Sequence, residues 1–358
     1  MSIRREKNKK PGVSYALGHL GQAGQGGVGV GVGAKDELEL PIVDVTHPAF
    51  ALAPTDPELA DEVARFLKEP QPLAGLPAFL RRPLLRFLLR GSVLARGIQS
   101  AEGGTLSGMN TYLLKLGPDN LGAAYARPID RRIAAALPVL AVRLRLADMA
   151  TLLAESLGPT LVARPRHPLR LVNIAGGPAM DSLNALIVLR RDRPGVLDGR
   201  RIQIDVLDRD GDGPAFGARA LTALRAEGAP LHGLDVQLRH VRTDWTETGP
   251  LRDLLRAARI GTSVIAGSSE GGLFEYGTDA EIEANLDCLR DEAPSHFVMV
   301  GSVTRADEPI QRLRETSRAA TRPRGLTAFR ALAARCGWRV VRAIERPFSD
   351  HVVLSRAP

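Results

Sequence analysis

The chain has 358 residues, enough for one large domain or two ordinary domains with a proper core. Its hydrophobic content is 44%, but no run approaches the roughly 18 uninterrupted apolar residues of a membrane span, and no secretory signal is visible. The formal net charge of +8 lies partly in the basic N-terminus, and no basic stripe with interleaved aromatics follows, so we expect no nucleic-acid partner.

Residues 1–40 predict a disordered, basic and glycine-rich tail. Gly18 to Gly33 contains eight glycines and too little apolar surface to offset the entropy of ordering. The VGVGVGAK stretch superficially resembles a phosphate-binding loop, but neither a GKS or GKT ending nor a preceding strand accompanies it. We therefore place no phosphate site in the tail.

Residues 41–160 predict a helical region that begins with a short extended connection, residues 41–53. Asp56-Pro57-Glu58 combines a cap, a first-turn proline and an early acid, which predicts a helix to Lys68. Further helical patterns cover Leu76–Gln99, Ser107–Leu116 and Asp130–Leu157, the last bent near Pro138.

The stretch from Leu169 to Leu189 combines a strand, a small-residue corner and a helix. Its first six residues form a β-rich apolar run, and Leu183, Leu186 and Leu189 recur later at helical spacing. Gly176 and Gly177 lie between the two patterns, where glycine permits a positive φ and removes side chains from the path of a ligand. Strand, glycine corner and helix together are typical of a cofactor bound on backbone amides at a helix N-terminus.

After Leu189 the patterns alternate. Strand patterns cover Arg201–Leu207, Leu234–Val241, Ser263–Ala266 and His296–Val303, and helical patterns cover Pro214–Glu227, Leu251–Arg259, Asp279–Arg290 and Arg324–Gly337. Two closing strands, Trp338–Ile344 and His351–Ser355, have so short a link that they must pair antiparallel or lie close together. The alternation predicts an α/β, Rossmann-like domain over residues 161–358, with a parallel sheet and right-handed crossovers.

Polar residues follow three of these strands at the carboxyl ends, where such a sheet binds its ligands. Asp208 ends the second strand, where a carboxylate can accept both hydroxyls of a ribose. Asp244 ends the third strand, where it can accept an exocyclic adenine amine, and Trp245 offers a stacking face. Residues 268–270 (Ser-Ser-Glu) follow the fourth strand. One polar group per strand end, in order, predicts a nucleoside cofactor.

From Leu169 to the C-terminus the chain resembles the class I S-adenosylmethionine-dependent methyltransferases. The resemblance lies in the glycine corner, the acidic ends of the second and third strands and the closing hairpin; NIAGGPA, residues 173–179, is similar to that family's D-I-G-G-G-P-G motif. It implies a seven-stranded sheet, parallel with one antiparallel strand, and S-adenosylmethionine as cofactor. It also implies that the helical region, residues 41–160, forms a lid or substrate region over the cofactor.

The corner departs from the family motif at three positions. Asn173 replaces the usual acid, and Ala175 and Ala179 replace glycines. MDS, residues 180–182, and SEGGLFEYG, residues 269–277, resemble motifs of the leucine carboxyl methyltransferase-like branch, L-D-T and E-G-L-L-M-Y-L. This narrower resemblance suggests a branch within the superfamily.

The resemblance and the strand-end positions together give the candidate site. The expected cofactor contacts are Arg127, Asn173, Ala175, Gly176, Gly177, Asp181, Asp208, Asp244, Trp245, Ser268 and Ser269. Arg127 would pair with the cofactor's methionine carboxylate, or else would be a helix-start arginine paired with Asp130. Glu270 is the candidate catalytic base, or else it structures its loop. Tyr112, Phe274 and Tyr276 would line an acceptor pocket, or else would be core aromatics.

No metal site is expected, because the histidines are scattered and Cys288 and Cys336 lack ligand spacing. Both cysteines are most simply buried thiols, and a cytoplasmic location follows from the absence of a disulfide framework.

Methyl transfer is an in-line displacement in which the protein aligns the nucleophile and excludes water. The leading hypothesis is O- or carboxyl-methylation of a small-molecule acceptor. A catalytically silent methyltransferase-fold binding protein is the first alternative, suggested by Asn173 and the missing glycines. An NAD-dependent oxidoreductase is the second, because the acid after the second strand also suits NAD, but the corner lacks GxGxxG and the closing hairpin disfavours it. The oligomeric state stays open, a homodimer included.

Overall fold

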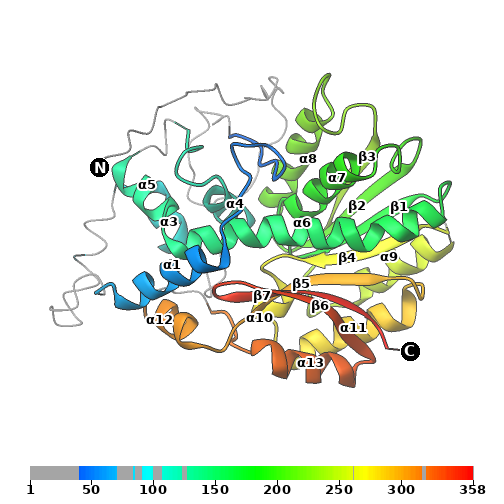
Figure 1. Cartoon of the computed structure of the whole chain (residues 1–358). Helices are drawn as coiled ribbons and strands as arrows, with labels where there is room; N and C mark the ends of the chain where they lie inside the picture. The colour runs from blue at the N-terminus through cyan, green and yellow to red at the C-terminus, as the bar shows by residue number, and fades with distance from the viewer. Residues whose placement is uncertain are drawn as a thin grey trace, which may run out of the picture.

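Figure 1 shows the computed structural model of the chain, which describes residues 40–70, 84, 91–99, 107–122, 127–260, 262–316 and 320–357. The expected tail lies outside the described residues except for Leu40, and most of the helical pattern Leu76–Gln99 lies outside them as well. Across the described ranges, no helix combines the length and the apolar character that crossing a membrane requires.

A seven-stranded sheet forms the centre of the fold, and its strands follow one another in space as β3-β2-β1-β4-β5-β7-β6. The strands are β1 Leu169–Ile174, β2 Arg201–Asp208, β3 Asp235–Arg242, β4 Val264–Ser269, β5 Val298–Thr304, β6 Trp338–Glu345 and β7 Ser349–Arg356. The pairs among β1 to β5 are parallel, whereas β7 runs antiparallel to both of its neighbours, β5 and β6. The predicted fold class is therefore confirmed.

The strand order reverses at β1, which has β2 on one side and β4 on the other. At such a reversal the loops that follow the two strands diverge to opposite faces of the sheet and leave a crevice at their carboxyl ends. The glycine corner, residues 175–179, follows β1, so the topology places it at this crevice.

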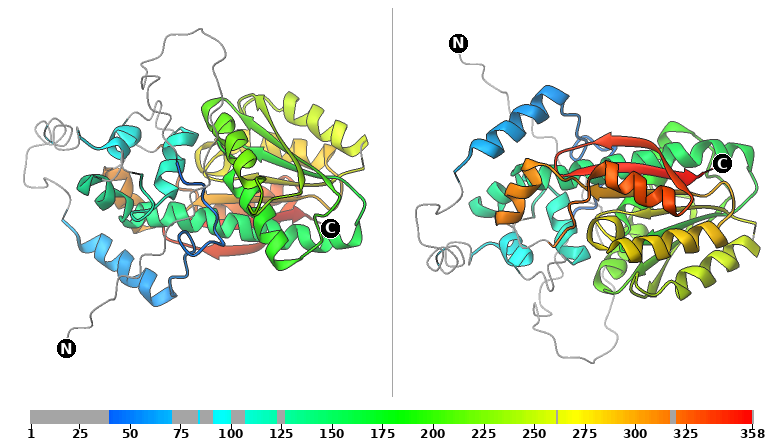
Figure 2. Two further views of the ribbon diagram at one scale, coloured as in Figure 1. Left: turned by 90° about the horizontal axis from the view of Figure 1, so that it is seen from above. Right: turned by 90° about the horizontal axis from the view of Figure 1, so that it is seen from below.

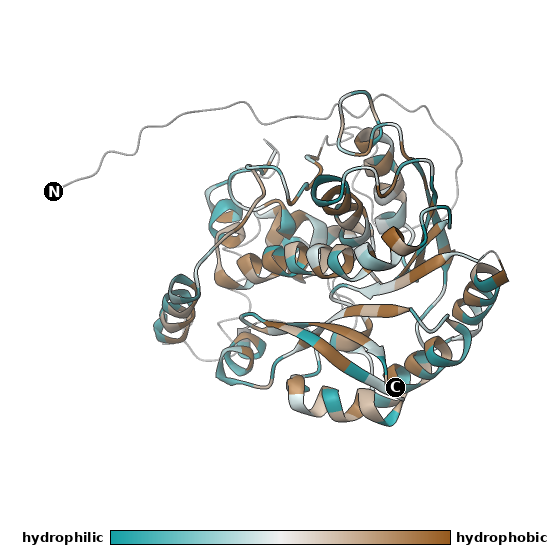
Figure 3. Ribbon diagram, turned by 45° about the vertical axis from the view of Figure 1, so that its right-hand side comes forward, coloured by the Kyte–Doolittle hydropathy of each residue, from teal (hydrophilic) through white to brown (hydrophobic). Residues whose placement is uncertain are grey.

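Helices cover both faces of the sheet (Figure 2). On one face lie α6 (Leu137–Ala163), α7 (Met180–Asp192) and α8 (Asp212–Leu224), which share a core with Leu171 and Ile204. On the other lie α9 (Gly249–Ile260), α11 (Asp279–Glu292) and α13 (Gly325–Arg335), which share a core with Val172. Neighbouring strand residues thus enter opposite cores, as the two-residue period of a strand requires. Hydrophobic and hydrophilic residues are mixed along the strands (Figure 3), and the edge strands β3 and β6 are less buried than the central ones.

Among the described residues, the helices before α6 are α1 Asp56–Lys68, α3 Val93–Gln99, α4 Gly108–Lys115 and α5 Pro128–Ala134. α1 is capped one residue earlier than expected, by Thr55 rather than Asp56. The cap is a capping box, in which the Thr55 hydroxyl accepts the Glu58 amide and the Glu58 carboxylate accepts the Thr55 amide. The predicted bent helix Asp130–Leu157 is two helices, because the chain leaves helical geometry around Ala136, the N-cap of α6.

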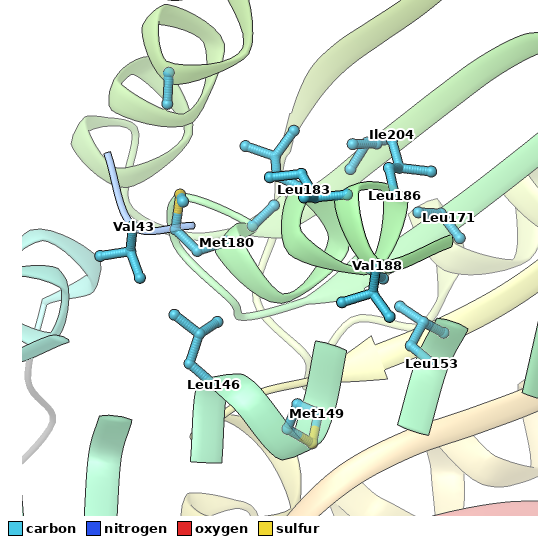
Figure 4. Packing of buried hydrophobic residues seen from close by; sticks show 14 of the residues in the cluster. Val43, Leu146, Met149, Leu153, Leu171, Met180, Leu183, Leu186, Val188 and Ile204 are labelled. Carbon is cyan, nitrogen blue, oxygen red and sulfur yellow. The ribbon is translucent and has the colours of Figure 1, made fainter. Parts of the chain in front are cut away.

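α6 is 27 residues long and extends from the N-terminal helices across the sheet (Figure 1). Its residues Leu146, Met149 and Leu153 are buried against α7, where Leu183 and Leu186 belong to the same core (Figure 4). The expected division between residues 160 and 161 therefore falls inside one helix. A single core connects the two sequence regions.

Two helices have no counterpart in the predicted pattern. α10 (Leu273–Tyr276) has only four residues, which is too short to show a period. α12 (Glu308–Thr316) has two apolar side chains, Ile310 and Leu313, among charged ones. Both lie near the carboxyl ends of β4 and β5, where the loops build the candidate site.

Candidate active site

The corner after β1 has a positive φ at Gly177, as the glycine motif predicts, but its other positive φ angles fall on two alanines and not on Gly176. Ala175 has φ of 55°, Gly177 has φ of 54° and Ala179 has φ of 54°. The Ala175 amide donates to the Leu207 carbonyl at 2.8 Å, which ties the corner to β2. A left-handed backbone costs a residue with a Cβ roughly 1–2 kcal/mol, so the two alanines hold a strained turn.

Behind the corner lies a buried polar cluster made by Asn173, Asp181 and Ser268, all at most 2% exposed. The Asn173 amide Nδ2 donates to Asp181 Oδ1 at 2.7 Å and to Ser268 Oγ at 3.2 Å. Asn173 Oδ1 and Asp181 Oδ2 are buried and have no hydrogen-bond partner among the described residues. Burial, with the nearby negative charge of Glu270, raises the pKa of Asp181 to about 6.

Gly176 is required by this cluster, because a Cβ at position 176 would collide with Asn173 Oδ1. The two unsatisfied oxygens are acceptors, and leaving them unpaired in the interior costs roughly 1–3 kcal/mol each. An ammonium or another hydrogen-bond donor is the kind of group with which such acceptors pair. The chemistry of this cluster therefore fits the amino-acid end of S-adenosylmethionine, whose ammonium is a donor group.

Asp208 lies at the end of β2 and holds the corner in place. Its carboxylate accepts the Gly177 amide at 2.9 Å through Oδ2 and the Asp210 amide at 2.9 Å through Oδ1. Burial raises the pKa of Asp208 above its ordinary value, although the two amide donors oppose the rise. A carboxylate has about four lone-pair sites, so two remain for ribose hydroxyls.

Gly177 is packed from outside by two other glycines. A Cβ at Gly177 would lie 2.7 Å from the Cα of Gly108 in α4, and a Cβ at Gly213 in α8 would lie 2.8 Å from the Cα of Gly177. The space that the sequence assigns to a cofactor chain beside the Cα of Gly177 is thus filled by the backbone of α4. Gly177 remains part of the corner, but a side chain at this position would collide with the backbone of α4 rather than with a ligand.

Asp244 and Trp245 follow β3 as expected. The Asp244 side chain is 33% exposed, and its carboxylate accepts the Thr246 amide at 3.0 Å. The Trp245 indole nitrogen donates to Glu281 Oε2 at 3.1 Å, and the ring packs against the second core. Asp244 is accessible for an adenine amine, whereas Trp245 is held by protein contacts.

Glu270 is the centre of a buried ion-pair network. Its carboxylate lies 2.6 Å from Lys115 Nζ and 3.2 Å from Arg145 Nε, and Arg145 also contacts Glu275 at 3.1 Å. Burial opposes the ionised form, but the charges and hydrogen bonds of Lys115 and Arg145 outweigh it and hold the pKa of Glu270 below its ordinary value. A carboxylate neutralised in this way is a weak base, which favours the alternative that Glu270 structures its loop.

A cavity of about 310 Å³ lies beside this network. Apolar side chains dominate its wall, among them Leu114, Ile133, Val139, Val142, Ile310 and Phe348. The polar side chains that reach it are those of Thr111, Arg145, Glu275, Tyr276, Arg314, Thr304, Thr321 and Ser349. The cavity lies at the carboxyl ends of β4 and β5, the edge at which sheets of this kind bind ligands.

Of the three aromatic candidates for the acceptor pocket, only Tyr276 lines the cavity. Burial, helped by Glu275, raises the pKa of Tyr276 to about 12, so it is a neutral phenol. Tyr112 is fully buried, accepts the Val43 amide at 3.2 Å and donates to the Pro41 carbonyl at 2.5 Å. Phe274 is fully buried against Phe329. Tyr112 and Phe274 therefore follow the alternative of core aromatics.

Arg127 and Ser269 have structural partners. Arg127 is the N-cap of α5, is exposed, and donates to the Gly91 carbonyl at 2.7 Å. Asp130 accepts instead from Ser92 at 2.5 Å, so the structure gives it a partner other than Arg127. Ser269 Oγ accepts the Leu273 amide at 2.9 Å and begins α10.

Sequence reasoning missed Lys115, Arg145 and Asp148, as well as Ser349 and His351 in the closing hairpin. Arg145 and Asp148 lie one turn apart on α6, among apolar residues. Charges inside an apolar helical pattern are a signal of buried pairing, but only the fold identifies their partners.

Comparisons with known proteins do not assign the chain to a family. Neither a protein-family model nor a curated protein matches it. A possible exported protein from Bordetella parapertussis is similar at 19% identity, over 86% of this chain and 100% of that one, with a TM-score of 0.48. A DUF574 family protein from Streptomyces avermitilis is 14% identical over 73% of this chain and 99% of that one, with a TM-score of 0.46. A mitomycin 7-O-methyltransferase is 15% identical over 85% of this chain and 74% of that one, with a TM-score of 0.39. Likenesses at this level carry no functional argument.

Proposed function

We propose that this chain is an S-adenosylmethionine-dependent methyltransferase that transfers a methyl group to an oxygen or carboxylate of a small molecule. The observation that carries the proposal is the pair of unsatisfied buried acceptors, Asn173 Oδ1 and Asp181 Oδ2, directly behind a glycine corner at the strand-order reversal. The narrower resemblance to the leucine carboxyl methyltransferase-like branch stays a prediction.

The departure of Asn173 from the family motif is compensated within the same cluster. Asn173 donates a hydrogen bond to Asp181 Oδ1, so the carboxyl group behind the corner is that of Asp181 instead of one at position 173. This arrangement supports a site that binds the cationic methionine end. Asp208 would accept the ribose hydroxyls, Asp244 the adenine amine, and the bound cofactor would supply an electrophilic methyl group.

Calorimetric titration with S-adenosylhomocysteine, and separately with NAD, tests the cofactor assignment. We expect saturable binding of the first and none of the second. Asp208→Asn should weaken binding by about 1.5–3 kcal/mol, the range for hydrogen bonds to a charged group. Asp198→Asn, which changes an exposed acid ahead of β2, is the matched control and should bind like the native chain. Binding of NAD alone would overturn the proposal.

A catalytically silent binding protein is the second candidate, and Asn173 at the motif's acidic position is the observation that favours it. A screen for consumption of the methyl donor over fractionated cell extract separates the two. Donor-dependent product in any fraction supports the enzyme. S-adenosylhomocysteine binding without product in every fraction supports the binding protein.

A further inference from the structure

Three side chains from α6 and β7 form a hydrogen-bonded series that ends at the cavity. Asp148 Oδ2 lies 2.9 Å from His351 Nδ1, and His351 Nε2 lies 3.1 Å from Ser349 Oγ. Ser349 and His351 are two residues apart on β7, so both point to the face that α6 covers. His351 is fully buried, and Ser349 is among the residues that line the cavity.

The partners of Asp148 favour its ionised form. Arg346 contacts Asp148 through Nε at 2.8 Å and Nη2 at 3.2 Å. Burial opposes the ionised carboxylate, but the hydrogen bonds from His351 and Arg346 outweigh it and lower the pKa of Asp148. An ionised carboxylate only accepts, so the hydrogen between Asp148 and His351 lies on Nδ1 of the ring. In that tautomer Nε2 can accept the Ser349 hydroxyl.

A second hydroxyl lies beside Ser349 on the neighbouring strand. Thr304 of β5 is the cross-strand partner of Ser349, which brings their side chains together on one face. Thr304 lines the same cavity, is 2% exposed, and its Oγ1 has no hydrogen-bond partner in the part of the chain that the structure describes. At this edge of the cavity one orphaned hydroxyl thus lies next to one that is backed by an imidazole, among a wall that is mostly apolar but also carries Arg145, Glu275 and Tyr276.

Phe348, directly before Ser349, has φ of 69°, which is rare for an aromatic residue. Its ring packs edge-on against Phe66 with centroids 5.4 Å apart, and it lines the cavity. Backbone strain of this kind persists only where the surroundings enforce it, and it gathers at functional sites.

Resting on the proposed function, we infer that the cavity binds a small, largely apolar alcohol or phenol, and that its hydroxyl proton leaves through Ser349 to His351. The acceptor oxygen hydrogen-bonds Ser349 and Thr304. As that oxygen becomes nucleophilic, its proton moves to Ser349 Oγ, and the Ser349 proton moves to His351 Nε2. Asp148 stabilises the resulting imidazolium and is a positioning residue, as in other hydroxyl–imidazole–carboxylate series. This series supplies the base that Glu270, neutralised by two cations, does not.

The test uses the full-length chain, 7-hydroxycoumarin as probe, and no methyl donor. The neutral phenol and the phenolate of this probe have separate fluorescence excitation bands, so the bound form can be read directly. At a pH where the free probe is neutral, we expect the native chain to bind it saturably and to show the phenolate band. Ser349→Ala and His351→Gln should reduce the phenolate fraction about tenfold while the dissociation constant changes by less than about threefold.

Ser355→Ala is the control, because it removes a serine hydroxyl from the same strand away from the cavity and should behave like the native chain. Thermal melting of each variant shows whether it folds. Three results would each overturn the inference. The native chain could bind the probe only as the neutral phenol, it could show no saturable binding, or the phenolate band could survive in both variants. S-adenosylhomocysteine titration is independent of this readout, so failure of the cofactor assignment would be seen separately.

Discussion

Gly108 and Gly177 meet backbone to backbone, and a Cβ added to Gly177 would lie 2.7 Å from Gly108 Cα. Real Cβ contacts are not that close, so position 177 is closed by α4 rather than by a ligand. The glycine corner therefore turns the chain after β1 and also allows α4 to pack closely against it.

The first prediction follows from this contact. Gly177→Ala should lower the free energy of unfolding by about 2–4 kcal/mol, because it adds a clash to the cost of a left-handed backbone. Gly199→Ala is the matched control: Gly199 has φ of 65°, and its added Cβ meets nothing within 4 Å among the described residues. It should cost only about 1 kcal/mol. Urea unfolding measures both, and equal losses would show that the contact with α4 carries no energy.

The second prediction concerns the strained alanine at the start of the corner. Ala175→Gly should raise the free energy of unfolding by up to about 1 kcal/mol, because glycine takes φ of 55° without a Cβ penalty. Ala218→Gly, at an exposed position within α8, should lower it by about 1 kcal/mol, as in any helix interior. The opposite signs can be read from thermal melting. A loss of stability at position 175 as well would mean that the Ala175 methyl contributes more than the strain costs.

The third prediction is a pH dependence from Asp181. Its folded-state pKa is raised to about 6, so between roughly pH 4 and 6 the folded chain holds a proton that the unfolded chain has released. Stability from this group is therefore present at low pH and falls as pH rises through that window. Asp181→Asn should be more stable than the native chain at pH 7, on the order of 2 kcal/mol, and the difference should shrink toward pH 4. The same variant should bind S-adenosylhomocysteine more weakly. A stability difference that does not vary with pH would contradict the assignment.

The fourth prediction concerns the buried ion pairs. Glu270→Gln should cost about 3–5 kcal/mol, because it leaves the side chains of Lys115 and Arg145 without their shared counter-charge. Adding Lys115→Met to it should cost less than the sum of the two single losses, since the second change removes the stranded ammonium. Glu155→Gln, in an exposed pair with Arg342, should cost less than about 1 kcal/mol. Additive losses in the double-mutant cycle would show that Lys115 and Glu270 do not interact.

The order of strands and helices after Leu169 could be predicted because each element carries a local pattern. The run LRLVNI predicts a strand without any long-range information. The positions of Asp208 and Asp244 near the ends of β2 and β3 could be predicted because each apolar run ends just before them. The seven-stranded sheet with its antiparallel strand followed from the resemblance and is confirmed. These inferences needed only neighbours in sequence.

Within the candidate site, only the residues that belong to local sequence motifs could be predicted. Asn173 and Asp208 lie at the crevice as expected, because a strand end fixes its own last residue. The partners of Glu270 could not be found, since Lys115 and Arg145 are 155 and 125 residues away in sequence. The series from Asp148 to His351 spans 203 residues and depends on α6 crossing the sheet. Tyr112 was ambiguous because a buried tyrosine and a ligand-binding one look alike until their hydroxyl partners are known.

The continuity of α6 decides which part of the molecule can open. Arg145 on this helix contacts the Glu270 loop after β4, and Asp148, one turn later, contacts His351 of β7. A helix of 27 residues moves as one rod, so sliding it to admit a ligand would break both contacts at once. We expect it to stay fixed against the sheet, as the stationary side of the entrance. The helices before Leu137 form the opposite side, where α4 contacts the corner through Gly108 and the Glu270 loop through Lys115.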